Sequence, residues 1–248
     1  MFVSTRGLVI RSVQYKDADR VLTVLSDKLG RVTVKARGVS RKNSRLASSA
    51  QLFSCSDMVL YESQGRYCLN EAQVVEQFEG LRSDISRMAL ASYFAEVLGF
   101  EEETEETGGE ELLRLTLNCL YALSSGKYPE ALIKAAFELR YMAQSGYEPD
   151  LFSCSGCGEV LEQGRAVPER GEVYCPACAA PFGIDISANA LAAARHILTC
   201  ELKKLLSVSV TPDEARQLSE FSGRYLRSCL ERGFKTLDFY NDCSVQKR

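Results

Sequence analysis

Apolar and polar residues alternate through the first third of the chain. From Ser4 to Phe78 the apolar positions recur at every second residue, in runs rich in Val, Leu and Tyr. A period of two is typical of β-strands that bury one face. We expect five strands, over residues 5–13, 20–26, 31–38, 52–61 and 66–76, with a tight turn at Gly30 between the second and the third. Five short antiparallel strands in about 75 residues are typical of the oligonucleotide-binding barrel, the OB-fold, and an SH3-like barrel is the alternative.

The expected third strand has one apolar and one cationic face. Val32, Val34 and Ala36 lie on the apolar face, and a polar, basic loop with little to bury follows over residues 38–45. We expect a nucleic-acid contact from six cations that lie within 15 residues without an acid between them: Arg31, Lys35, Arg37, Arg41, Lys42 and Arg45. Phosphates favour such a layout through counterion release. The alternative is a solvated strand edge that stays charged to prevent pairing with other strands.

Aromatic residues accompany this basic segment. Tyr15, Phe53, Tyr61 and Tyr67 are available to stack on nucleic-acid bases, although an aromatic residue in a strand more often belongs to the core.

From Leu81 onward the apolar period lengthens to that of a helix. We expect a first helix after a cap at Ser83 or Asp84, a second near 111–124, a third from Pro129 to Gly146, a fourth over 188–206 after Ser187, and a fifth from the capping box Thr211–Glu214 to near Gly233. Residues 101–111 carry seven acids in 11 positions, which indicates a solvated connector or a docking strip for a basic partner.

Two Cys-x-x-Cys pairs stand 17 residues apart in the helical part of the chain. Zn²⁺ accepts four thiolates at tetrahedral corners about 2.3 Å away, and this spacing is typical of such a site. We expect one zinc ion bound by Cys154, Cys157, Cys175 and Cys178, within a ribbon over residues 150–182 that is inserted between helices. Four sulfur ligands leave no position for a water or a substrate, so the expected role is structural. The other six cysteines are expected as reduced, mostly buried thiols.

The charge distribution separates the two parts further. Residues 1–80 contain 12 Lys and Arg against 8 Asp and Glu, a net charge of +4, whereas residues 81–248 contain 18 against 25, a net charge of −7. A positive N-terminal part indicates a polyanionic partner. We therefore expect an α+β protein of several domains, with a nucleic-acid-binding OB-fold over 1–80 and a helical domain over 81–248.

Neither a membrane segment nor a catalytic constellation is recognisable. No apolar run approaches the roughly 18 residues that a membrane span needs, and no signal peptide precedes the first strand, so we expect a cytoplasmic protein. His196 is the single histidine, and the glycine-rich phosphate-binding loops are absent. We expect a protein that is not an enzyme and has no small-molecule substrate.

Several motifs, taken in order along nearly the whole chain, resemble the bacterial RecO family. They are Gly7-Leu-Val-Ile10, Leu25-Ser-Asp-Lys-Leu-Gly30-Arg31, the basic stretch from Arg37 to Arg45, Phe137-Glu-Leu-Arg140, and Gly146-Tyr-Glu-Pro149 before the first cysteine pair. The resemblance implies a DNA repair protein that mediates recombination without catalysis. It also implies binding of single- and double-stranded DNA, annealing of complementary strands, and a nucleoid-associated location. With RecR, such a protein loads RecA onto strands coated by single-strand-binding protein, and RecF is a further partner.

The chain departs from the family pattern at two places. Val39 and Ser40 stand where the family has Ala and a basic residue, so no DNA contact is expected there, and Asp17 replaces a Glu in a turn. Lys134 and Arg140, on the helix before the ribbon, are expected candidates for an acidic tail such as that of single-strand-binding protein, or else lie on an exposed helix face. Two alternative functions remain at this point: an RNA-binding or ribosome-associated barrel-plus-ribbon protein, and a scaffold whose charges only maintain solubility.

Overall fold

The computed structural model describes residues 1–99, 109–179 and 181–245, and its chain divides into two units. The first unit contains Met1–Arg114 and Thr236–Arg248, and the second contains Leu115–Lys235. The expected domain boundary at residue 80 stays a prediction.

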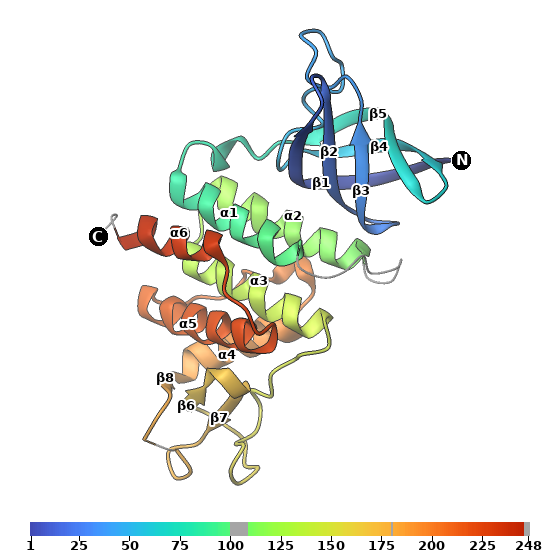
Figure 1. The fold of residues 1–248 in the computed structure, drawn as a ribbon. Coiled ribbons are helices and arrows are strands. Elements are labelled where there is room, and N and C mark those ends of the chain that lie inside the picture. Colours follow the sequence, from blue (N-terminus) through green and yellow to red (C-terminus); the bar gives the residue numbers. More distant parts are fainter. Residues whose placement is uncertain (100–108, 180, 246–248) are drawn as a thin grey trace. The chain divides into compact units, whose positions relative to one another are not determined.

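Five strands form a closed barrel in the first unit, drawn in blue to cyan in Figure 1. They are β1 (Phe2–Tyr15), β2 (Asp19–Ser26), β3 (Gly30–Ala36), β4 (Cys55–Ser63) and β5 (Arg66–Glu76). Their order around the barrel is β1-β2-β3-β5-β4, with a parallel pairing of β3 and β5 and antiparallel pairings elsewhere. This arrangement confirms the expected five-stranded barrel of the OB type.

The barrel closes partly because β1 pairs with two neighbouring strands. Its first half pairs with β4 and its second half with β2, and the register shifts between Val9 and Arg11. Such a bulge bends a long strand and increases its twist. Alternate residues then point inward and form one apolar cluster, whose members include Val9, Leu22, Val24, Val34, Met58 and Leu60. Gly30 has a φ of 60°, as the tight turn between β2 and β3 requires.

The basic segment after β3 buries more apolar side chains than its composition indicates. Val39 is 2% exposed and belongs to the barrel core together with Ala50, and Leu46 packs against the same cluster. The expectation of a loop with little to bury is therefore wrong. The segment begins beside the β1–β2 turn, because Ser40 N–H donates to the carbonyl of Ala18. Gly38 N–H donates to the Asp19 carboxylate at 2.8 Å in the same region.

Two helices of the first unit accompany the barrel. The first, α1 (Ile85–Leu98), begins at the expected Asp84 cap, whose carboxylate accepts hydrogen bonds from the N–H groups of Ser86 and Arg87. The second, α6 (Lys235–Val245), was not expected from the sequence. Glu96 of α1 accepts a hydrogen bond from Thr236 N–H at 3.0 Å, which satisfies one of the free donors at the start of α6. Of the acidic segment 101–111, residues 101–108 lie outside the described residues.

Helix α2 (Gly109–Ser125) spans the division between the units, and three further helices belong to the second unit. These are α3 (Glu130–Gln144), α4 (Ala188–Thr199) and α5 (Pro212–Cys229), and the capping box of Thr211 and Glu214 at the start of α5 is confirmed. Helix α4 ends before the expected residue 206. The chain is extended at Cys200 and folds back, so that His196 Nε2 lies 2.9 Å from the carbonyl oxygen of Lys204. None of the described helices combines the length and apolar content that a membrane crossing requires.

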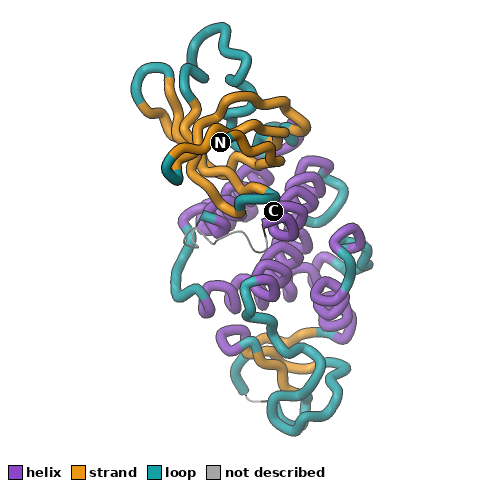
Figure 2. The backbone as a smooth tube through the Cα atoms, turned by 90° about the vertical axis from the view of Figure 1, so that its right-hand side faces the viewer, coloured by secondary structure: helices purple, strands orange, loops and turns teal. Residues whose placement is uncertain are grey.

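A small three-stranded sheet carries the cysteine ribbon. It consists of β6 (Gly164–Val167), β7 (Glu172–Tyr174) and β8 (Ile184–Ile186), in the order β7-β6-β8. In Figure 2 these short strands appear in orange among teal loops. Arg195 of α4 holds the ribbon by donating to the carbonyls of Leu151 and Leu161 at 2.8 and 2.6 Å. Strand β8 lies beyond the expected end of the ribbon at residue 182.

Candidate nucleic-acid interface and metal centre

Part of the predicted cationic set gathers where β3 ends and the basic segment begins. Lys35 lies on the outward face of β3, and its ammonium stands 5.0 Å from the centre of the Tyr15 ring at the end of β1. Arg37 and Arg41 follow, both exposed, and the Arg41 guanidinium lies over Gly38, where an added Cβ would be 3.5 Å from Arg41 Nε. The structure thus brings Lys35, Arg37 and Arg41 to the barrel end that also carries the β1–β2 turn. Lys42 and Arg45 are exposed farther along the same segment.

Lys16 belongs to this group and was missed in the sequence. Lys16 directly follows Tyr15, the last residue of β1, and its ammonium stands 5.6 Å from the centre of the Tyr15 ring. Asp17 and Asp19 stand in the same turn, so the sequence shows no excess of positive charge there and Lys16 was not recognised. A lysine in the connection between the first two strands is nevertheless informative, since OB-folds bind oligonucleotides with this loop and with the face of strands 2 and 3.

Arg31 is placed differently from the other predicted contacts. Its guanidinium donates to the carbonyl oxygen of Gly99 at the end of α1, at 3.1 Å, and the residue is only partly exposed. A cation at a helix C-terminus is favoured by the exposed carbonyl groups and the helix dipole. The alternation of the strand puts Arg31 on the cationic face, but its guanidinium is occupied by the carbonyl group at the end of α1.

The remaining cations are available to an anion. Among the described residues, none of Lys16, Lys35, Arg37 and Arg41 forms an ion pair. Arg6 on β1 is different, because it forms an ion pair with Asp57 at 2.8 Å, and this hydrogen bond lowers the pKa of that carboxyl group. We define the cationic surface as Lys16, Lys35, Arg37 and Arg41. Its role in nucleic-acid binding stays a prediction.

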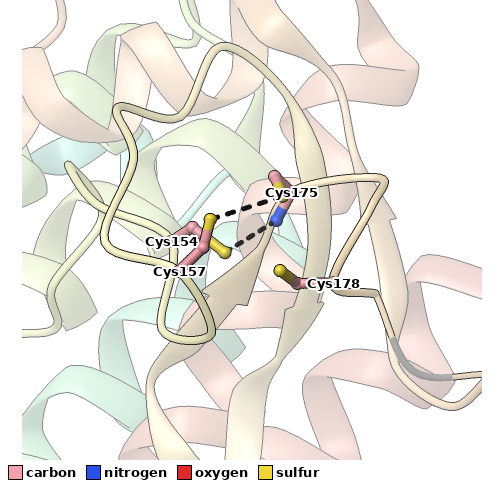
Figure 3. A group of neighbouring side chains, drawn as sticks. All are labelled: Cys154, Cys157, Cys175 and Cys178. Atoms are coloured by element: carbon pink, nitrogen blue, oxygen red, sulfur yellow. Dashed lines mark hydrogen bonds between the residues drawn. The ribbon is translucent and has the colours of Figure 1, made fainter.

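The four predicted zinc ligands come together at the open end of the ribbon (Figure 3). Their sulfur atoms all lie within 4.8 Å of one another, and those of Cys157 and Cys175 are 3.9 Å apart. A tetrahedron with metal–sulfur bonds of about 2.3 Å has edges of about 3.8 Å. The cysteine side chains are therefore close to the arrangement that a four-coordinate metal requires.

Backbone geometry explains why the two pairs converge. Each pair closes a turn, with Gly158 N–H donating to the Cys154 carbonyl and Cys178 N–H donating to the Cys175 carbonyl. Gly156, inside the first pair, allows the second pair to approach, because a Cβ at Gly156 would lie 2.9 Å from that of Cys178. The Cys154 sulfur accepts hydrogen bonds from the N–H groups of Cys175 and Gly156 at 3.2 and 3.4 Å. These bonds, that from Cys175 first, lower the pKa of Cys154 to about 6, which favours the thiolate that binds a metal.

The two candidate partner contacts on α3 have internal roles. Lys134 is only 4% exposed, and its ammonium donates to Glu138 and to the carbonyl of Ser219 at 2.9 Å each. The expectation that Lys134 lies on an exposed helix face is wrong, because α3 packs against α5 with this side inward. Arg140 is partly exposed and donates to the carbonyl of Leu198 in the last turn of α4. A contact between Arg140 and a partner stays a prediction.

Fold and site together define an α+β protein in which a five-stranded barrel precedes a helical part with a four-cysteine cluster. Residues 1–78 match the family model "Recombination protein O N terminal", and residues 82–238 match "Recombination protein O C terminal". The chain belongs to the RecO family of DNA repair and recombination proteins.

Curated relatives agree with this assignment over most of their length. The chain is similar to the DNA repair protein RecO of Acetivibrio thermocellus, with 29% identity over 241 residues, which cover 96% of each chain. It is 31% identical to that of Symbiobacterium thermophilum over 240 residues, with 94% of each chain covered. The protein from Heliobacterium modesticaldum is 32% identical over 223 residues, or 86% of this chain and 80% of the relative.

Proposed function

We propose that this protein is a recombination mediator that binds single- and double-stranded DNA through the cationic surface and anneals complementary strands. With RecR, it would load RecA onto DNA coated by single-strand-binding protein, with RecF as a further partner. It would act in the cytoplasm on nucleoid DNA, without catalysis, a small-molecule substrate or a membrane. The observation that supports the proposal is the cationic surface itself, whose residues come from the β1–β2 turn, from β3 and from the segment after β3. OB-folds bind oligonucleotides with that turn and with the face of strands 2 and 3, and the chain is a member of the RecO family.

Annealing follows from the physics of such a surface. Two complementary strands repel each other through their phosphates, and this repulsion opposes the encounter that precedes pairing. Cations that neutralise phosphates reduce the repulsion, and contacts confined to the backbone leave the base edges free. The protein would therefore accelerate pairing without making or breaking a covalent bond.

A strand-annealing assay tests this function. We expect the protein to increase the rate at which complementary DNA oligonucleotides pair, also when one strand is coated by single-strand-binding protein. Strands of matched RNA serve as the second arm, because the OB-fold alone does not distinguish the two polymers and the 2′-OH is the group that would. Equal or faster annealing of RNA would favour the RNA-binding alternative, and no acceleration of either polymer would favour the scaffold.

We further propose that the four cysteines hold one structural zinc ion. All four ligands are thiols, and no water or substrate would share the coordination shell. Zinc would join the two turns of the ribbon and so keep the hairpin of β6 and β7 in register. The ribbon is also anchored by Arg195 and by the ion pair between Arg224 of α5 and Glu169, so the metal is one of several attachments.

Replacing Cys175 by Ser should release the metal and loosen the ribbon. We expect a zinc content near zero by atomic emission and a lower unfolding temperature, since each kcal/mol lost lowers the midpoint by about 2–4 °C in a chain of this size. Oligonucleotide affinity should be unchanged, because the cationic surface belongs to the other unit. Cys200→Ser, which removes a thiol outside the cluster, is the control. Loss of DNA binding in a folded Cys175→Ser protein would instead place the ribbon in the binding surface.

A further inference from the structure

A row of outward-facing side chains crosses the barrel strands at the level of Lys35. Register pairs connect its members without interruption from the second half of β1, through β2, β3, β5 and β4, back to the first residue of β1. We call this row the barrel belt, and its members are Val13, Val21, Lys35, Cys68, Tyr61 and Phe2. The neighbours of the belt along the strands, Leu22, Val34 and Leu60 among them, belong to the core. Because side chains alternate along a strand, the belt residues point to solvent.

The belt exposes large aromatic and apolar side chains to solvent. Phe2 is 62% exposed and Tyr61 45%, and their rings meet with centres 5.3 Å apart. Tyr15, two residues beyond Val13 on the same face of β1, is 44% exposed. A large aromatic residue in a strand usually supports the core, so exposed rings on the outer surface of a small barrel indicate a ligand.

The charges beside these rings identify the kind of ligand. Lys35 belongs to the belt, and its ammonium and that of Lys16 lie 5.0 and 5.6 Å from the centre of the Tyr15 ring. Arg37 and Arg41 continue the positive charge along the basic segment. Aromatic platforms combined with unpaired cations are the arrangement by which proteins bind single-stranded nucleic acid, with bases stacked on the rings and phosphates near the cations. A duplex keeps its bases stacked on each other and has no free base face to offer.

We propose that the barrel belt binds single-stranded DNA, with bases stacked on Tyr15 and on the Phe2–Tyr61 pair and with Lys35 neutralising a phosphate between them. Two strand spacings, about 10 Å, separate Lys35 from Tyr61, so one oligonucleotide can contact both. The inference rests on the proposed DNA-binding function and adds how the strand is held. Stacking uses the faces of the bases and leaves their pairing edges free, which is the presentation that annealing requires.

A single-tryptophan variant tests the stacking directly. The chain contains no Trp, so Tyr61→Trp introduces the only indole. We expect a single-stranded oligonucleotide to quench its fluorescence, and an abasic oligonucleotide of the same length to bind without that quenching. Tyr121→Trp on α2, where the tyrosine is 66% exposed and belongs to the other unit, should not respond to either.

Binding of Tyr61→Ala gives the second measurement. Loss of one stacked base should weaken single-strand affinity by about 5- to 150-fold while the salt dependence and the duplex affinity stay unchanged, because no phosphate contact is removed. Tyr61→Phe, which keeps the ring, should bind like the wild type. The ring is nearly half exposed, so these substitutions leave the core intact.

The outcomes separate this inference from the function on which it rests. Equal quenching by base-bearing and abasic strands, or full affinity of Tyr61→Ala, would overturn the stacking while DNA binding stands. If Tyr61→Ala keeps its affinity for single strands but no longer binds a partner protein, the belt is a protein-docking surface instead. If the wild type binds no oligonucleotide, the proposed function and this inference both fail.

Discussion

Replacing Lys35, Arg37 and Arg41 together by Ala is expected to weaken oligonucleotide binding and to flatten its dependence on salt. If each cation neutralises one phosphate, the slope of log K against log salt should decrease by about 3 units for duplex DNA and about 2 for single strands. The loss should be similar for all base sequences, because phosphate contacts carry no sequence information. The three side chains are suited to this test because they lie on one end of the barrel and form no ion pair among the described residues.

Titrations at several salt concentrations, followed by fluorescence anisotropy, measure the slope. The matched control is a triple Ala variant of Lys127, Lys203 and Lys204, which removes the same charge from exposed positions of the second unit. The control should lower the affinity slightly through the net charge and leave the slope unchanged. An unchanged slope in the barrel variant would mean that these cations do not contact phosphates, and the cationic surface would lose its assignment.

The strand pattern predicted on which face of β3 each cation lies, but not what each side chain contacts. Arg31 and Lys35 share one side of β3 by simple alternation, yet Arg31 donates to the carbonyl of Gly99, directly after α1, whereas Lys35 lies beside Tyr15. The position of a helix that is distant in sequence decides between the two, and one sequence carries no direct information on it. For the same reason Lys16 was missed, because its relevance comes from Tyr15 and Lys35, which meet only when the barrel closes.

Local motifs predicted more where the chemistry is itself local. The spacing of the four cysteines predicted one cluster, and the sulfur atoms do converge, because each Cys-x-x-Cys pair needs only its own turn and the hairpin between them. The N-caps of α1 and α4 and the capping box of α5 were also correct. Helix α6 was missed, although Leu237, Tyr240 and Cys243 recur at helical spacing and are buried, because the segment is short and lacks a strong cap residue.

The error at Lys134 shows how an exposed and a buried ion pair look alike in sequence. Lys134 and Glu138 stand four residues apart, a spacing that is common on solvated helix faces. In the structure the pair is enclosed between α3 and α5, where the Ser222 hydroxyl donates to Glu138 at 2.6 Å. Gly223 makes room for it, since a Cβ there would lie 2.5 Å from the Lys134 nitrogen. The glycine in the middle of α5 was the available signal of a close approach.

Replacing Glu138 by Gln should therefore destabilise the helical unit strongly. The substitution keeps the volume and removes the charge, so the Lys134 ammonium, 4% exposed, stays buried without its counterion. Breaking a buried pair in this way costs about 3–5 kcal/mol, because the remaining charge has lost both water and partner. Urea unfolding followed by circular dichroism measures the change. Glu201→Gln is the matched control, since its pair with Lys203 has a similar length, 2.7 Å, but is 65–72% exposed, and such pairs contribute about 0–1 kcal/mol.

The double variant Lys134→Met with Glu138→Leu distinguishes the cost of one unpaired buried charge from the loss of the whole ion pair. Both charges are then replaced by apolar groups of similar volume, and such replacements are often neutral or stabilising because no ion has to be desolvated. We expect the double variant to recover most of the stability that Glu138→Gln loses, although Ser219 and Ser222 lose hydrogen-bond partners. Because neither residue lies in the barrel unit, oligonucleotide affinity should be the same in every folded variant. A double variant as unstable as Glu138→Gln would mean that the hydrogen bonds of the pair, rather than its charge balance, hold α3 against α5.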